Sequence, residues 1–129
     1  MTAVPAALRQ VVPEVVQTSA LDCGPACLKS ALGGFGVDVS YPRLREACQT
    51  DIDGTSIDNM EEIAQQFGVF AEQSVIPVDH VFAKKGNSFP SIVVTKLPSG
   101  STHFVVLWKR YGPFLQLMDP ASGRRLTTW

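Results

Sequence analysis

The sequence predicts an α+β fold in which a helical N-terminal half packs on a C-terminal antiparallel sheet. In the first half, glycine and proline occur where helices start and stop, and apolar residues recur with helical spacing. After about residue 69 the spacing of the apolar residues becomes that of strands. The last two apolar segments are joined by a short turn with a glycine, as in a β-hairpin. Helices followed by antiparallel strands are expected to form segregated layers.

Two helices are expected before residue 50. The first covers residues 25–32, because Pro25 suits a first helical turn and Gly33 and Gly34 follow the last turn. The second is short and covers residues 42–48.

A third helix is expected over residues 56–67. Thr55 and Asp58 have the spacing of a capping box, and Gly68 follows the end of the helix. The apolar stripe of this helix consists of Ile57, Met60, Ile63, Ala64 and Phe67.

Four strands are expected in the second half of the chain, over residues 69–75, 90–96, 103–109 and 113–118. The third is the most apolar and reads His-Phe-Val-Val-Leu-Trp-Lys. Residues 110–112, Arg-Tyr-Gly, form the turn that joins it to the fourth.

Composition narrows the class of protein. The chain has 129 residues, 45% of them hydrophobic, which fits one domain with a core. The net charge is −1 without a basic patch, so nucleic acid is not an expected partner. No apolar run reaches the length of about 18 residues that a membrane span needs. Residues 1–11 are expected to form an N-terminal arm that is not a signal peptide, and residues 12–129 the domain.

Cys23 is the candidate nucleophile. It lies where the first helix is expected to begin, so its thiol would face the positive end of the helix dipole, which favours the reactive thiolate. Gly24 is expected to let a substrate approach the backbone closely. The alternative is that Cys23 is a small buried apolar residue, as most free cysteines are.

Two further cysteines, Cys27 and Cys48, are expected to belong to the core. The total of three is odd, which argues against a closed disulfide framework and for a reducing, cytosolic compartment. A metal site built from cysteine and histidine stays open, although the spacing matches no common zinc pattern.

His103 and Asp119 are the candidate base and its orienting residue. In an antiparallel hairpin the numbers of facing residues have a constant sum, and a three-residue turn centred on Tyr111 makes that sum 222. This register would place His103 opposite Asp119, with Cβ atoms about 5 Å apart. The carboxylate would then select one tautomer and leave the other ring nitrogen for the thiol. The only other histidine, His80, has no comparable partner and is expected at the surface.

Gln17 is a candidate for the oxyanion hole. It lies six residues before Cys23, and its side-chain amide and the Cys23 backbone N–H are both suitable donors. The alternative is a solvated glutamine in a loop.

These residues together resemble the double-glycine leader peptidases, the N-terminal domains of bacterial peptidase-containing ABC transporters. The resemblance extends from about Val12 to Leu126. The shared residues are Gln17, the segment 22–28 (Asp-Cys-Gly-Pro-Ala-Cys-Leu), residues 53–56 (Asp-Gly-Thr-Ser), residues 103–107 (His-Phe-Val-Val-Leu) and Asp119-Pro120.

The resemblance implies a papain-like fold and a cysteine endopeptidase. In the family the matched positions act as nucleophile (Cys23), general base (His103), orienting residue (Asp119) and part of the oxyanion hole (Gln17). The substrate implied is a bacteriocin or related precursor peptide, cut after a Gly-Gly pair that ends its leader. No motif identifies residues that contact the leader.

The resemblance also implies a setting for the reaction. An attached or associated transporter with membrane and ATPase domains is the expected partner, and the cytosolic face of the bacterial inner membrane the expected location. The peptidase reaction is expected to need no metal or cofactor. ATP and Mg²⁺ are expected only in a transporter portion, which this chain does not contain.

Two other functions stay open at this point. One is a non-catalytic leader-binding module of an exporter, although such modules typically lack the nucleophile. The other is an acyltransferase or amidase that uses the same three residues on a different acyl group.

Overall fold

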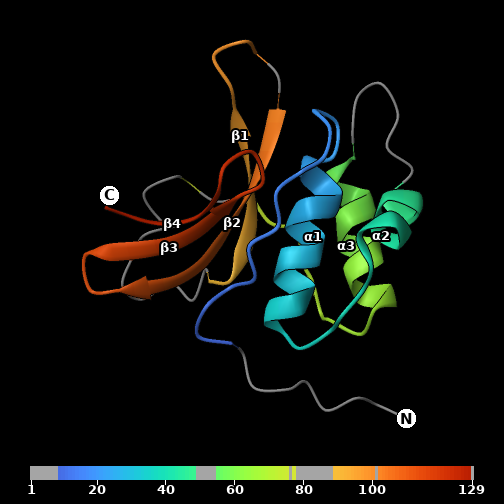
Figure 1. Ribbon diagram of the computed structural model, residues 1–129, viewed down its shortest axis with the longest axis horizontal. Coiled ribbons are helices and arrows are strands. Elements are labelled where there is room, and N and C mark those ends of the chain that lie inside the picture. Colours follow the sequence, from blue (N-terminus) through green and yellow to red (C-terminus); the bar gives the residue numbers. More distant parts are fainter. Residues whose placement is uncertain (1–8, 49–54, 76, 78–88, 101, 129) are drawn as a thin grey trace.

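The fold has two layers, with helices on one side and an antiparallel sheet on the other (Figure 1). The computed structural model describes residues 9–48, 55–75, 77, 89–100 and 102–128. The helices in these ranges are α1 (Cys23–Gly34), α2 (Tyr41–Cys48) and α3 (Ile57–Gln66). The strands are β1 (Ser91–Lys96), β2 (Thr102–Tyr111), β3 (Phe114–Asp119) and β4 (Gly123–Thr128). The predicted α+β architecture is confirmed.

The sheet follows the order of the chain, β1-β2-β3-β4, and each neighbouring pair is antiparallel. Its two faces have different partners. Alternate side chains of β2, such as Phe104, Val106 and Trp108, join the core that the helices cover. The intervening side chains, such as Val105 and Leu107, form a second apolar cluster on the other face, with side chains of β3.

α1 contacts the sheet closely because it ends in glycine. A Cβ on Gly34 would overlap the six-membered ring of Trp108 on β2. The indole is almost fully buried, donates its N–H to the carbonyl of Arg9 at 2.8 Å, and meets Phe35 edge-on at 5.6 Å between ring centroids. The aromatic ring therefore fills the space that the missing side chain leaves.

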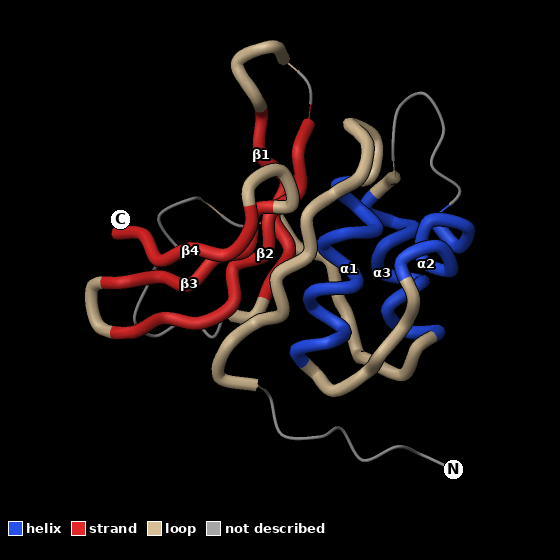
Figure 2. The backbone as a smooth tube through the Cα atoms, in the orientation of Figure 1, coloured by secondary structure: helices blue, strands red, loops and turns tan. Residues whose placement is uncertain are grey.

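The chain before α1 runs along the seam between the two layers (Figure 2). The backbone N–H of Val12 donates to Oε1 of Gln116 on β3 at 2.7 Å. On the opposite side, the Ser30 hydroxyl of α1 donates to the carbonyl of Pro13 at 2.6 Å. Both layers thus hold this segment, which leads directly to Gln17 and Cys23.

The prediction of a strand over residues 69–75 is wrong. The segment is irregular, and Phe70 and Val75 are largely exposed. Its backbone groups form hydrogen bonds with side chains of α3 and not with a neighbouring strand. Gln65 donates to the carbonyl of Ala71 at 2.8 Å, and Glu61 accepts from Gln73 N–H at 3.2 Å. The apolar pattern of this segment did not lead to a strand, because α3 side chains bind its backbone groups.

β4 was not predicted, because most of its side chains are polar and exposed and no apolar alternation marks it. The other elements agree with the prediction to within about two residues. The predicted capping box is also wrong: Ser56, not Thr55, caps α3, through a hydrogen bond from Asn59 N–H at 3.2 Å.

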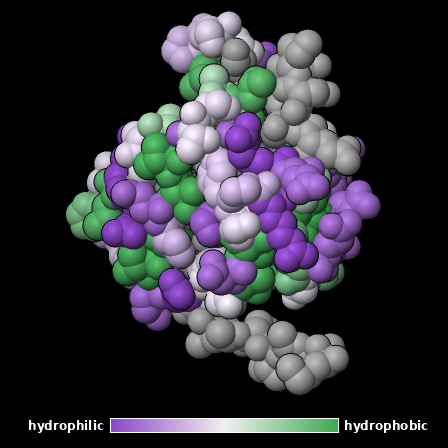
Figure 3. All heavy atoms as spheres, turned by 45° about the vertical axis from the view of Figure 1, so that its right-hand side comes forward, coloured by the Kyte–Doolittle hydropathy of each residue, from purple (hydrophilic) through white to green (hydrophobic). Residues whose placement is uncertain are grey.

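On the face drawn in Figure 3, apolar side chains occur in several separate patches among polar ones. None of the helices in the described ranges has the length and apolar character required to span a bilayer.

Candidate active site

α1 begins at Cys23, two residues earlier than predicted. The thiol therefore lies in the first turn, at the positive end of the helix dipole. Cys23 is 8% exposed, so it is close to the surface without being free in solvent. Pro25 follows inside the first turn, where its missing N–H removes no helical hydrogen bond.

The structure gives a different reason for a glycine at position 24 from the predicted one. A Cβ at this position would lie 2.7 Å from Cβ and Oγ1 of Thr55, much closer than van der Waals contact. The glycine therefore lets the segment before α3 pack against the start of α1. The expectation that Gly24 leaves open space for a substrate is wrong on this side of the backbone.

The His103 imidazole and the Asp119 carboxylate are in direct contact, with 2.8 Å between Nε2 and Oδ1. A carboxylate only accepts hydrogen bonds, so Nε2 carries the proton of this contact. Nδ1 is then the ring nitrogen with a lone pair for a substrate or thiol proton. The backbone N–H of Ala121 donates to the same carboxylate oxygen at 2.9 Å and holds it in place.

These contacts keep Asp119 ionised. Partial burial alone raises its pKa, but hydrogen bonds from His103 and from Ala121 N–H, together with the positive charge of Arg125, hold the pKa below its ordinary value. The carboxylate thus stays available as an acceptor at neutral pH.

The predicted register of the β2–β3 hairpin is wrong, although the predicted contact forms. The turn has two residues, so Tyr111 pairs with Phe114 and the numbers of paired residues add up to 225. An irregularity between Leu107 and Lys109 then changes this sum to 224 for the pairs nearer His103. His103 and Asp119 are therefore diagonal neighbours on one face instead of facing residues. The predicted sum of 222 differs by two from the observed sum of 224, and a shift of two residues keeps each side chain on the same face of its strand.

Gln17 lies beside the same end of the sheet. Its backbone N–H donates to the carbonyl of Pro120, directly after Asp119, at 2.7 Å. One N–H of its side-chain amide donates to Ser19 O at 2.9 Å. Its Oε1 is buried and has no donor among the described residues, which marks the amide as incompletely satisfied.

The two halves of the candidate site approach each other at the start of α1. Pro120, directly after Asp119, accepts a hydrogen bond from the backbone N–H of Gln17, in the segment that leads into α1 and Cys23. Within the described ranges the structure records no hydrogen bond between Cys23 and His103. Catalytic hydrogen bonds are commonly long before substrate is bound.

Cys27 and Cys48 belong to the helical core, as predicted. Burial raises the pKa of Cys27 well above its usual value and that of Cys48 to about 11. Both side chains are therefore protonated thiols at neutral pH. All three cysteines are free.

A polar cluster beside Cys23 was missed from the sequence. Asp22 is fully buried, and its Oδ2 accepts hydrogen bonds from Thr18 at 3.0 Å, Tyr41 at 3.2 Å and Arg45 at 3.0 Å. A signal was present, since Tyr41 and Arg45 have the i, i+4 spacing that puts two side chains on one helix face. His80 and residues 53–54 lie outside the described residues.

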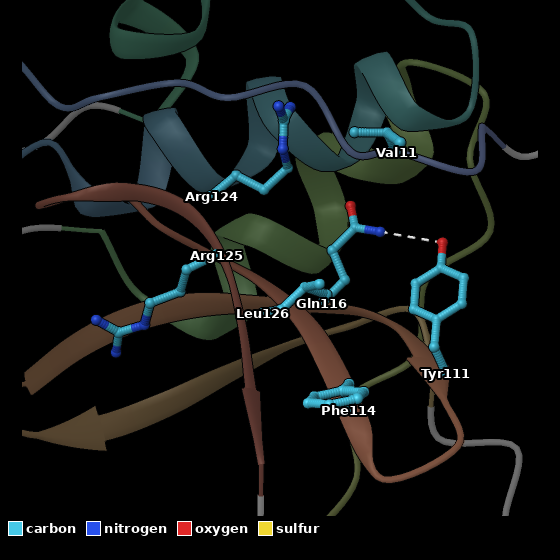
Figure 4. Close-up of a pocket in the computed structure, with 7 residues that line it drawn as sticks. All are labelled: Val11, Tyr111, Phe114, Gln116, Arg124, Arg125 and Leu126. Carbon is cyan, nitrogen blue, oxygen red and sulfur yellow. Dashed lines mark hydrogen bonds between the residues drawn. The ribbon is translucent and has the colours of Figure 1, made fainter.

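A surface pocket of about 470 Å³ lies away from this site (Figure 4). Its lining comes from Val11, from Tyr111 at the end of β2, from Phe114 and Gln116 of β3, and from Arg124, Arg125 and Leu126 of β4. In it Gln116 donates to the Tyr111 hydroxyl at 3.2 Å. None of the predicted site residues lines it.

Comparison with known proteins identifies relatives of the whole domain. Residues 12–128 match the peptidase C39 family. The chain is 30% identical over 110 residues to the lactococcin-G-processing and transport ATP-binding protein LagD of Lactococcus lactis subsp. lactis, a match that covers 85% of this chain and 16% of that protein. The chain thus spans a small part of that relative.

Two solved structures share the fold. One is a double glycine motif protease from an AMS/PCAT transporter in complex with the leader peptide, with a TM-score of 0.78, 28% identity, and coverage of 96% of this chain and 84% of that one. The other is the peptidase domain of Streptococcus ComA, a bi-functional ABC transporter involved in a quorum sensing pathway, with a TM-score of 0.77, 26% identity, and coverage of 89% and 85%. Because the family match spans nearly all of its length, this chain belongs to the peptidase C39 family of cysteine peptidases, and its α+β architecture is papain-like.

Proposed function

We propose that this domain is an endopeptidase that removes the leader from a bacteriocin or related precursor peptide, cutting after a Gly-Gly pair. The observation that carries the proposal is the 2.8 Å contact between His103 and Asp119 in a chain whose α1 begins at Cys23. The likeness to a double glycine motif protease in complex with a leader peptide supports this substrate class.

The reaction begins at the Cys23 sulfur. His103 Nδ1 accepts the thiol proton, and the thiolate attacks the carbonyl carbon of the second glycine. The C–N bond then breaks, and the imidazolium returns the proton to the leaving amine. Water, deprotonated by the same nitrogen, attacks the thioester carbonyl. The C–S bond breaks, the imidazolium returns the proton to the Cys23 sulfur, and the leader leaves with a new carboxylate.

Charge is stabilised at two points in this sequence. Asp119 holds Nε2–H and stabilises the imidazolium that forms after the first proton transfer. The Gln17 amide and the Cys23 N–H donate to the oxyanion of each tetrahedral intermediate. All groups for this chemistry come from the chain itself, so no metal or cofactor takes part in the proposed steps.

The proposed setting is export. LagD and ComA are processing or bi-functional transporters. We therefore propose that the domain acts next to the membrane and ATPase domains of an ABC transporter, at the cytosolic face of a bacterial inner membrane. ATP and Mg²⁺ would serve those domains and not the peptidase step.

The test is cleavage of a panel of double-glycine precursor peptides, with the cut site read by mass spectrometry. Cys23→Ser should abolish cleavage while Cys27→Ser, the same substitution one turn further along α1, should retain it. Binding of the precursors without any cut would favour a leader-binding module. Deamidation or acyl transfer without a cut would favour an amidase or acyltransferase. Either result overturns the proposal.

A further inference from the structure

The residue before the nucleophile does not do what its position suggests. Asp22 occupies the N-cap of α1, where an aspartate normally accepts a hydrogen bond from an N–H of the first turn. Here the side chain makes no such bond. The carboxylate is buried, its Oδ2 accepts from Thr18 Oγ1, Tyr41 Oη and Arg45 Nε, and its Oδ1 has no partner among the described residues.

This orientation leaves the start of α1 without a cap. Pro25 has no N–H, and Ala26 N–H donates to the Asp22 backbone carbonyl at 3.1 Å. The N–H groups of Cys23 and Gly24 have no acceptor among the described residues. A capping carboxylate would occupy this region with negative charge, where the proposed mechanism needs two neutral donors for an oxyanion.

The Tyr41 hydroxyl connects the two ends of the turn that precedes α1. It accepts from the backbone N–H of Thr18 at 3.2 Å and donates to Asp22 Oδ2 at 3.2 Å. Thr18 directly follows Gln17, and Asp22 directly precedes Cys23. One hydroxyl on α2 therefore contacts the residue next to each proposed oxyanion donor.

The turn itself completes the arrangement. The Asp22 N–H donates to Ser19 O at 3.1 Å, and the same carbonyl accepts from the Gln17 side chain at 2.9 Å. The other end of the turn is attached to the sheet through Gln17 N–H and Pro120 O. The Gln17 amide is thus oriented by a carbonyl whose own place depends on Asp22.

We propose that Asp22 is a positioning residue for the oxyanion hole. Because Tyr41 and Arg45 hold its carboxylate, Asp22 leaves the start of α1 uncapped and aligns Gln17 with Cys23. The inference rests on the proposed peptidase reaction. Its consequence is that the Asp22–Tyr41 contact affects the acyl-transfer steps more than substrate binding or thiol reactivity.

Tyr41→Phe tests this role with a matched control. The variant removes one hydroxyl that accepts one hydrogen bond and donates another. Tyr111→Phe removes a hydroxyl with the same pattern, which donates to Gln10 O at 2.7 Å and accepts from Gln116 at the other end of the sheet. The chain contains only these two tyrosines.

Three measurements are made on both variants with a double-glycine precursor. We expect Tyr41→Phe to lower kcat about 10- to 100-fold, because a small displacement of an oxyanion donor has effects of this order. KM should stay within about twofold of its original value. Alkylation of Cys23 by iodoacetamide, which forms no oxyanion, should also stay within about twofold. Tyr111→Phe should match the unmodified domain in all three.

A double variant shows whether Tyr41 acts through Gln17. If it does, Tyr41→Phe should lower kcat by a smaller factor in the Gln17→Ala background than in the unmodified domain, since effects on one interaction are not additive. Multiplicative losses, an unchanged kcat in Tyr41→Phe, or an equal loss of alkylation and cleavage would each overturn the positioning role. Absence of cleavage by the unmodified domain would instead overturn the proposed function.

Discussion

The role of Asp119 can be tested by comparing Asp119→Ala with Asp119→Asn. Its Oδ1 accepts from both His103 Nε2 and Ala121 N–H, at 2.8 and 2.9 Å. Alanine removes the acceptor and leaves a His103 N–H unpaired in a nearly buried position. A hydrogen bond to a charged group contributes about 1.5–3 kcal/mol. If this is lost where the imidazolium forms, kcat/KM should fall about 10- to 150-fold.

Asparagine should be much less harmful, because the Ala121 N–H fixes the orientation of the new amide. The Ala121 N–H requires an acceptor, so the amide oxygen of the asparagine takes the place of Oδ1. The same oxygen then also accepts from His103 Nε2–H. The tautomer is then preserved and only the charge is lost, which corresponds to about 1 kcal/mol and a fall of about fivefold. The assay is kcat/KM on a double-glycine precursor, with thermal unfolding as the check on folding.

Two results would refute this reasoning. If Asp119→Asn loses as much activity as Asp119→Ala, the negative charge matters more than the orientation of the imidazole. If Asp119→Ala retains nearly all activity, the contact with His103 has no part in catalysis.

Three further predictions follow from the site and the core. Iodoacetamide should modify Cys23 much faster than the two core cysteines, as peptide mass spectrometry would show, and equal rates would contradict an activated nucleophile. Folding lowers the pKa of Asp119, so its ionised form stabilises the domain above the unfolded-state pKa of about 4, and this stabilisation is lost as the pH falls further. Circular dichroism should therefore show that stability falls more steeply with decreasing pH in the unmodified domain than in Asp119→Asn. Gly34→Ala should lower the unfolding free energy by about 2–3 kcal/mol, because the new methyl group overlaps Trp108. Gly33→Ala, which meets only the Pro13 ring at 3.1 Å, should change it by less than about 1 kcal/mol, and equal losses in the two variants would show that the indole yields.

Local signals in the sequence were sufficient for most of the secondary structure. Proline and glycine at the ends of α1, the apolar stripe of α3 and the continuous apolar run of β2 act over a few residues, and the elements formed nearly where predicted. The exceptions have non-local causes. β4 is a strand because β3 offers it hydrogen bonds, whereas residues 69–75 have apolar alternation but bond to α3 side chains.

The candidate site shows the same division. Cys23 at the start of α1, and His103 and Asp119 at the ends of adjacent strands, could be inferred from spacing. The hairpin register could not, because a two-residue turn and an irregularity near Trp108 depend on how β2 packs. The inferred contact nevertheless forms, since the error of two residues keeps both side chains on one face.

By itself, the sequence determined the three helices, strands β1 to β3 and the residue types that carry the chemistry, because these depend on neighbours along the chain. Only the tertiary structure decided that Asp22 contacts Tyr41 and Arg45, that Thr55 fills the space beside Gly24, and that Pro120 holds Gln17. Each of these contacts joins segments that are distant in the sequence. Their positions follow from the packing of the two layers, which no local pattern encodes.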